Sequence, residues 1–213
     1  GEVHMKPDAV TFSTVMDAYS RSPGVSGPDA CRRCEELFRL MDSLGVRKNV
    51  YTFSALQNVY ARSGLPDALE RTTEVLEHMQ RLYQAGDIFA KPNCRNYNAV
   101  LNAASRTNTE ESARFAQDLL KNMESPSKEG GFDVEPDRVS YTLAILACSR
   151  IPNKTLAAEM SLATLEQMEN KANEEAKWRE QVSSAAPPVV RLDVECFNVV
   201  LTALSRTGES DSP

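Results

Sequence analysis

A thirteen-residue pattern occurs five times in this chain of 213 residues, and it constrains the fold more than any other feature. Each copy has Phe or Tyr at its fourth position and Arg at its last. The residues that follow the aromatic are separated by 41, 44, 44 and 56 positions. Self-similarity at intervals of tens of residues is typical of stacked structural repeats. The copies are AVTFSTVMDAYSR (9–21), VYTFSALQNVYAR (50–62), CRNYNAVLNAASR (94–106), RVSYTLAILACSR (138–150) and VECFNVVLTALSR (194–206).

A second pattern lies between successive copies and ends at a methionine. Apolar or small residues stand three, four and seven places before each methionine, which is the spacing of one face of an α-helix. These segments are CEELFRLM (34–41), TTEVLEHM (72–79), AQDLLKNM (116–123) and SLATLEQM (161–168). The sequence therefore predicts an all-α chain in which each repeat has a helix A followed by a helix B, an α-solenoid.

Asn or Asp stands directly before each expected helix A, as an N-cap would. We expect loops at 21–29, 125–137 and 183–193, where Pro, Gly and Ser gather. The mixed charges of ENKANEEAKWREQ favour a longer helix B in the fourth repeat. We divide the single array into a tail of a preceding repeat (1–8), repeats at 9–49, 50–93, 94–137 and 138–193, and the first helix of a fifth repeat (194–213). The chain is thus expected to be part of a longer array.

Each helix A has two faces of different character. At 100° per residue, the aromatic and the residues three and seven places after it form one stripe, which we expect to be core. This stripe comprises Phe12, Val15, Tyr19, Phe53, Leu56, Tyr60, Tyr97, Val100, Ala104, Tyr141, Ala144, Cys148, Phe197, Val200 and Leu204. The opposite arc carries a short polar residue and the final Arg. One explanation for that Arg is a favourable interaction with the carbonyl end of helix A. The alternative is a ladder of cations facing a regularly spaced polyanion.

The overall charge is acidic, with a formal net charge of −6 and a pI near 5.1. Taken alone, this argues against a nucleic-acid partner. The five A segments, however, hold seven arginines and two acidic residues, which leaves a net charge of −11 on the rest of the chain. A basic array within an acidic molecule can still contact phosphates. No apolar run is long enough to cross a bilayer, so no membrane partner is expected.

The chemistry of an enzyme or a metal site is not evident in the sequence. Cys31 and Cys34 form a C-x-x-C, but His4 and His78 are too far away in sequence to complete a zinc site. We therefore interpret the five cysteines as reduced residues that pack between helices. No Ser/His/Asp set, glycine-rich phosphate loop or paired-carboxylate motif stands out. We expect no catalytic activity, no cofactor, no metal and no small-molecule substrate.

The segments KPDAVTFSTVMDAYSR, KPNCRNYNAVLNAASR and EPDRVSYTLAILACSR resemble pentatricopeptide repeats, and the likeness covers nearly the whole chain. The resemblance implies a right-handed α-solenoid of helix–turn–helix repeats that binds single-stranded RNA, one base per repeat. It also implies a location in a mitochondrion or plastid. The repeats here are longer than the family's, which places the additional residues in loops or in longer B helices.

The resemblance assigns roles to residues of this chain. The residue after the aromatic and the last residue of the repeat read the base: Ser13 with Asn49, Ser54 with Asn93, Asn98 with Asp137, Thr142 with Asp193, and Asn198 without a partner. The residue three places before the reading residue packs on the base: Val10, Tyr51, Arg95 and Val139, with an unfavourable Glu195 in the fifth repeat. The final arginines lie near phosphates: Arg21, Arg62, Arg106, Arg150 and Arg206.

These pairs imply adenine, adenine, uracil and guanine in turn, and hence the target 5′-AAUG-3′. Short polar side chains on unpaired base edges and arginines near phosphates are chemically consistent with this function. The main alternative is a solenoid that binds a peptide or protein instead of RNA, with its arginines pairing to acidic side chains.

Overall fold

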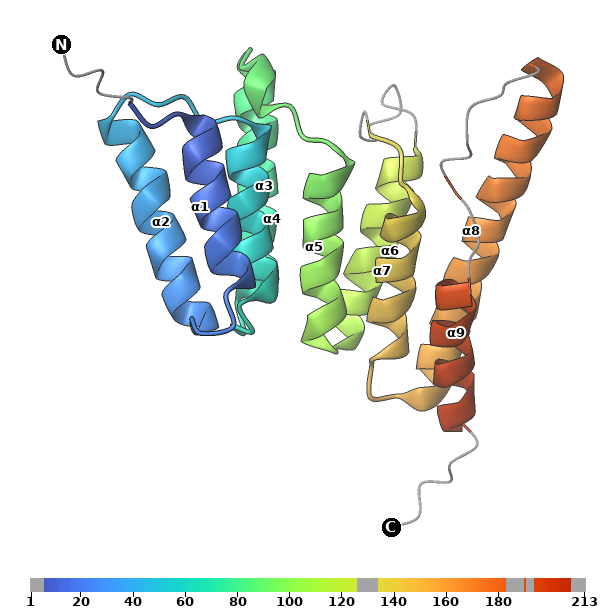
Figure 1. Cartoon of the computed structure of the whole chain (residues 1–213). Helices are drawn as coiled ribbons and strands as arrows, with labels where there is room; N and C mark the ends of the chain where they lie inside the picture. Colours follow the sequence, from blue (N-terminus) through green and yellow to red (C-terminus); the bar gives the residue numbers. More distant parts are fainter. Residues whose placement is uncertain (1–5, 126–133, 183–189, 191–193, 208–213) are drawn as a thin grey trace. The chain divides into compact units, whose positions relative to one another are not determined.

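The computed structural model describes residues 6–125, 134–182, 190 and 194–207, and most of these lie in helices (Figure 1). They fall into two compact units, residues 1–103 and 104–213, and each unit is described by itself. The helices are α1 (Ala9–Arg21), α2 (Gly27–Ser43), α3 (Val50–Arg62), α4 (Ala68–Gln84), the 3-10 turn η1 (Ile88–Ala90), α5 (Cys94–Thr107), α6 (Glu110–Glu124), α7 (Arg138–Ser149), α8 (Lys154–Val182) and α9 (Val194–Thr207).

The expected N-caps start the A helices. The side chains of Asp8, Asn49 and Asp137 accept hydrogen bonds from backbone N–H groups in the first turns of α1, α3 and α7. Because these N–H groups have no partner inside the helix, each cap contributes about 1 kcal/mol to helix stability. The hydrogen bonds from Thr11 also lower the pKa of Asp8. The predicted caps at these three positions are confirmed.

The B helices also follow the sequence pattern. Their pattern-ending methionines are all buried: Met41, Met79, Met123 and Met168. The long fourth helix B is confirmed, since α8 has 29 residues and reaches Val182. The loop expected at 21–29 is wrong in part, because α2 already begins at Gly27, where Ser26 accepts from the N–H of Asp29. Pro28 does not prevent this, since a proline in the first turn lacks only an N–H that would have no helical partner.

In the first unit, helical hairpins pack one on the next. Helix α1 contacts α2 and α3, and α3 contacts α2 and α4. Met16, Cys34, Leu56 and Val59 belong to one buried cluster of this unit. At its edge, the Tyr60 hydroxyl donates to the Glu35 carboxylate over 3.0 Å.

The second unit repeats this arrangement. Helix α7 contacts α6, α8 and α9, and α8 contacts α9. Ala113, Cys148, Ile151 and Met160 are part of its buried cluster. Each unit is therefore all-α and has the hairpin-on-hairpin packing of an α-solenoid, while the right-handed superhelix remains a prediction.

Two residues of the predicted core stripe are exposed. Val15 on α1 has 39% of its surface exposed and Phe197 on α9 has 41%. The equivalent Leu56 on α3 is 5% exposed, because α3 packs between the hairpin α1–α2 and its own partner α4. In its own unit, α1 has no described hairpin before it and α9 has none after it, so part of each apolar stripe stays exposed.

The predicted reduced state of the cysteines is confirmed, since all five are free thiols. Cys31 and Cys34 are buried side by side on α2, within the apolar cluster of the first unit. Burial raises the pKa of Cys34 to about 12 and the pKa of Cys148 to about 11. The C-x-x-C is thus explained by helix packing, since a reactive thiol needs a lowered pKa.

Arg150, the C-cap of α7, and Arg206, in the last turn of α9, donate hydrogen bonds to the carbonyl end of the preceding helix A. Nη1 of Arg150 donates to the backbone oxygen of Ser105 over 2.9 Å, and Nη1 of Arg206 donates to that of Ser149 over 2.8 Å. The last carbonyl groups of a helix lack partners within it and carry partial negative charge. These two bonds therefore link consecutive A helices.

The start of α2 and the end of α3 approach so closely that Gly27 is required. A Cβ added to Gly27 would lie 1.9 Å from the backbone oxygen of Ser63, whereas a Cβ on Gly24 would meet nothing within 4 Å. We expect Gly27→Ala to lower the free energy of unfolding by about 1–3 kcal/mol through overpacking. Gly24→Ala should change it by less than about 0.5 kcal/mol. Urea denaturation measures both, and equal stabilities of the two variants would contradict the close approach.

Because of the arginine–carbonyl bond, we expect two arginines at the same repeat position to contribute differently to the free energy of unfolding. Arg150→Ala should lower the free energy of unfolding by about 1 kcal/mol, because the carbonyl of Ser105 loses a charged donor. Arg62→Ala is the matched control: Arg62 is exposed and, within the described parts of the chain, has no ion-pair or hydrogen-bond partner. Its replacement should stay within about 0.5 kcal/mol of the parent. Thermal or urea unfolding that ranks Arg62→Ala as the more damaging change would contradict this structural role.

Candidate nucleic-acid interface

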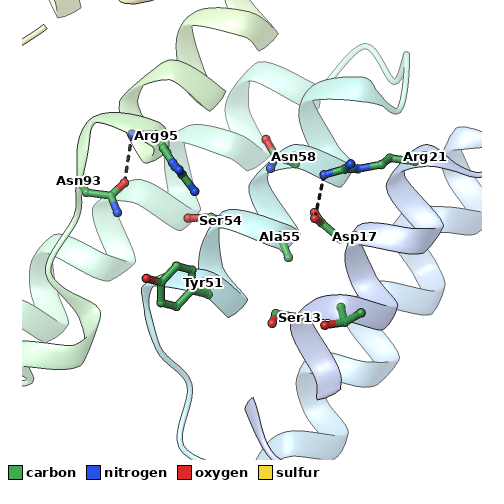
Figure 2. Close-up of a pocket in the computed structure, with 10 residues that line it drawn as sticks. Ser13, Asp17, Arg21, Tyr51, Ser54, Ala55, Asn58, Asn93 and Arg95 are labelled. Atoms are coloured by element: carbon green, nitrogen blue, oxygen red, sulfur yellow. Dashed lines mark hydrogen bonds and ion pairs between the residues drawn. The ribbon is translucent and has the colours of Figure 1, made fainter. Parts of the chain in front are cut away.

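A groove of about 230 Å³ lies in the first unit, between α1, α3 and the start of α5 (Figure 2). Its walls come from residues at equivalent positions of successive A helices and from the cap of α5. It is lined by Ser13, Thr14, Asp17, Arg21, Tyr51, Ser54, Ala55, Asn58, Asn93 and Arg95. Six of these ten are residues to which the sequence analysis assigned a role: Ser13, Arg21, Tyr51, Ser54, Asn93 and Arg95.

The second predicted reading pair, Ser54 and Asn93, lies on the wall of this groove. The Ser54 hydroxyl donates its proton to the backbone oxygen of Val50 over 2.7 Å. Oδ1 of Asn93 accepts from the backbone N–H of Arg95 over 3.0 Å. Since that backbone group can only donate, the Asn93 amide nitrogen is the atom left for another partner. The pair therefore offers an oxygen lone pair and N–H donors to a ligand.

Ser13 of the first predicted pair lies on the same groove, one repeat earlier. Its hydroxyl donates to the backbone oxygen of Val10 over 3.1 Å. Its predicted partner Asn49 caps α3, where Oδ1 accepts from the N–H groups of Tyr51 and Thr52. In both repeats the reading hydroxyl uses its own proton within its helix.

Three of the predicted base-packing residues are apolar or aromatic and are exposed. Tyr51 is 64% exposed, Val10 65% and Val139 43%. In Figure 2 the Tyr51 ring lies on the wall of the groove beside Ser54, with Arg95 above them. A ring and a guanidinium at such a site can stack on a planar ligand.

Arg21, predicted to lie near a phosphate, is paired with an acid inside the groove. Nη2 of Arg21 lies 3.0 Å from Oδ2 of Asp17, as the dashed line in Figure 2 marks. The pair is exposed, and such pairs are weak. Asp17 nevertheless reduces the positive potential that Arg21 would present to a phosphate.

The remaining predicted site residues lie elsewhere. Asn98 belongs to the first unit, and its amide nitrogen lies 3.6 Å from the sulfur of Cys94. Asp137 belongs to the second unit and caps α7. The Thr142 hydroxyl donates to the backbone oxygen of Arg138 over 2.9 Å. Asn198 is exposed on α9.

The arginines of this set differ in their surroundings. Arg62 and Arg106 are exposed. Arg150 and Arg206 donate to helix carbonyl groups, which leaves their other N–H groups for a further partner. Asp193, the predicted partner of Thr142, lies outside the described residues.

The role assignments left out four residues that line the groove, namely Thr14, Asp17, Ala55 and Asn58. Asp17 and Asn58 stand four positions after Ser13 and Ser54, so they lie one helical turn further along the same face. That spacing is the signal that could have identified them.

Among the described helices, none combines the length and apolar character that crossing a bilayer requires. In the same part of the chain, no three His, Cys, Asp or Glu side chains gather in a way that could hold a metal ion.

Comparison with known proteins identifies the repeats over part of the chain. Residues 36–107 match the family model of the pentatricopeptide repeat domain. They run from α2 through α5 and contain the groove residues of α3 together with Asn93 and Arg95. A search of curated proteins finds no match to the chain. Pentatricopeptide repeat proteins are a family linked to RNA binding and are generally not enzymes. The chain therefore carries pentatricopeptide repeats within residues 36–107, which confirms there the resemblance seen in the sequence.

Proposed function

We propose that this chain binds single-stranded RNA through the polar faces of its A helices, one base per repeat. The observation that carries the proposal is the groove of the first unit, where Ser13 and Ser54 from successive A helices line one surface with Tyr51 and Asn93. Short hydroxyl and amide groups suit the edges of unpaired bases, and an exposed aromatic ring suits their faces. The family match over α3 and the start of α5 supports the same function.

The charges around the groove favour moderate affinity. Arg62 is exposed on the helix that supplies Ser54, and Arg95 lies on the groove wall. Asp17 offsets Arg21, and the whole chain is acidic. Contacts with phosphates should therefore add salt-dependent affinity without strong long-range attraction.

The target we propose is 5′-AAUG-3′, read by the four pairs named in the sequence analysis. The second pair has the best structural support, since both of its members line the groove. Proteins with these repeats are commonly organellar. We accordingly propose a role in mitochondrial or plastid RNA metabolism, in the stability, processing or translation of a transcript.

Direct binding tests the proposed function. Fluorescence anisotropy should show at least about tenfold tighter binding to a short RNA containing AAUG than to a scrambled RNA or to DNA of matched sequence. The logarithm of the binding constant should fall with the logarithm of salt concentration by about 0.7 per phosphate contacted. A folded, helical sample that binds none of these strands would contradict the proposal and favour a protein-binding solenoid.

Exchange of one reading pair tests the base assignment. The family associates Thr with Asp at these positions with guanine. Ser54→Thr combined with Asn93→Asp should therefore change the preferred second base from adenine to guanine. Asp serves as an N-cap as well as Asn does, so the start of α5 should be preserved. Preference at the first base, measured on the same samples, is the internal control. A second-base preference that stays with adenine would show that this pair does not read the base.

A further inference from the structure

A buried amide connects the two members of the second reading pair. Asn96 on α5 has none of its surface exposed. Its Nδ2 donates to Oγ of Ser54 over 2.9 Å and to Oε1 of Gln57 over 2.8 Å. Its Oδ1 accepts from the backbone N–H of Asn93 over 2.9 Å. The side chain of Asn96 thus contacts the reading hydroxyl and also the backbone of the reading amide.

The direction of these bonds follows from the groups involved. The backbone N–H of Asn93 can only donate, so the Asn96 atom facing it is the oxygen and the atom facing Ser54 is the nitrogen. The carbonyl of Val50 can only accept, so it takes the proton of Ser54. With one lone pair accepting from Asn96, the Ser54 oxygen has one lone pair left. Toward the groove, Ser54 is consequently an acceptor.

The two buried amides occur together at one junction between repeats. The position of Gln57 in its helix is occupied by Met16 in α1 and by Ile145 in α7. The position of Asn96 is occupied by Thr52 in α3 and by Ser140 in α7. Burying an amide without partners is costly, and here Gln57 accepts from Asn96 and donates from Nε2 to the backbone oxygen of Thr72 over 3.2 Å.

A contact of the same kind occurs in the second unit. Cys196, which has the position of Asn96 in α9, places its sulfur 3.2 Å from Oγ1 of Thr142. The Thr142 hydroxyl gives its proton to the backbone oxygen of Arg138. The thiol is therefore the donor, and Thr142, like Ser54, accepts from the third residue of the next helix A.

The first repeat differs and provides a control within the chain. Thr52 has the position of Asn96, but its hydroxyl donates to the backbone oxygen of Asn49 over 2.8 Å. A hydroxyl has one proton, so Thr52 cannot also donate to Ser13. Both repeats carry a Ser/Asn reading pair. In the second repeat the Asn96 amide donates a hydrogen bond to the serine, whereas in the first repeat Thr52 donates none to Ser13.

We propose that Asn96 is a positioning residue that sets the base specificity of the second repeat. It holds the Ser54 oxygen and the backbone of Asn93 in one relative position, so that both members of the reading pair meet the base in the geometry that favours adenine. This inference rests on the RNA-binding function proposed above, and it moves part of the specificity of one repeat onto a residue of the next.

The test is Asn96→Thr, assayed by anisotropy with RNAs that carry each of the four bases at the second position. Threonine keeps the cap, as Thr52 does for Asn49, but cannot hold Ser54 as the amide does. The parent protein should prefer adenine over the other three bases, and the variant should lose roughly three- to tenfold of that preference. Preference at the first base should be unchanged. A structural role alone would weaken all four RNAs equally and leave the ratio intact.

Two further variants keep the outcome interpretable. Gln57→Met combined with Asn96→Thr reproduces the residues of the first junction, Met16 and Thr52, and replaces the test variant if the single change unfolds the protein. Thr52→Ser keeps a capping hydroxyl on α3 and should not alter the second-base ratio. If a folded variant still binds RNA and keeps the second-base preference of the parent, the role of Asn96 is overturned while the RNA-binding function stands. A parent protein that binds none of the RNAs overturns the proposed function as well.

Discussion

The hydrogen bonds that cap the A helices are the interaction on which the rest of the structure depends. Asn49 accepts from the first N–H groups of α3 and so fixes the residue at which that helix begins. Successive side chains turn by 100° around a helix, so the starting residue decides which ones face the core. It equally decides that Ser54, five positions after the cap, faces the groove. Asp8 and Asp137 stand five positions before Ser13 and Thr142 in the same way.

The fold could be predicted from the sequence where local signals repeat. A cap followed by an apolar stripe predicts one helix, and several copies of the same signal reinforce one another. The burial of Met41 and Met168 follows from helical spacing alone. The length of α8 follows from its uninterrupted mixed charges. The predicted burial of Val15 and Phe197 is wrong, because their exposure depends on which helices lie beside them.

The candidate site could be predicted only in part, because several roles depend on contacts between repeats. The helical face predicted that Ser54 and Tyr51 would line a common surface. It could not show that Asp17 would pair with Arg21. Nor could it decide between the two explanations of the final arginines. Arg150 supports the first of them, a favourable interaction with helix carbonyl groups, although the helix concerned is the preceding one. A guanidinium with five N–H groups can make this bond and still contact a phosphate.

The buried amide of Asn96 also bears on how far such repeats are interchangeable modules. Residues 50–93 contain the whole second reading pair, yet the group that orients Ser54 is supplied by the helix that follows. A transplant of the pair into another array would leave that group behind. If the repeat were inserted between new neighbours, Gln57 would likewise face a different residue at the third position of the next helix A. The smallest portable unit at this junction is therefore not a repeat but a reading pair together with the first turn of the next helix.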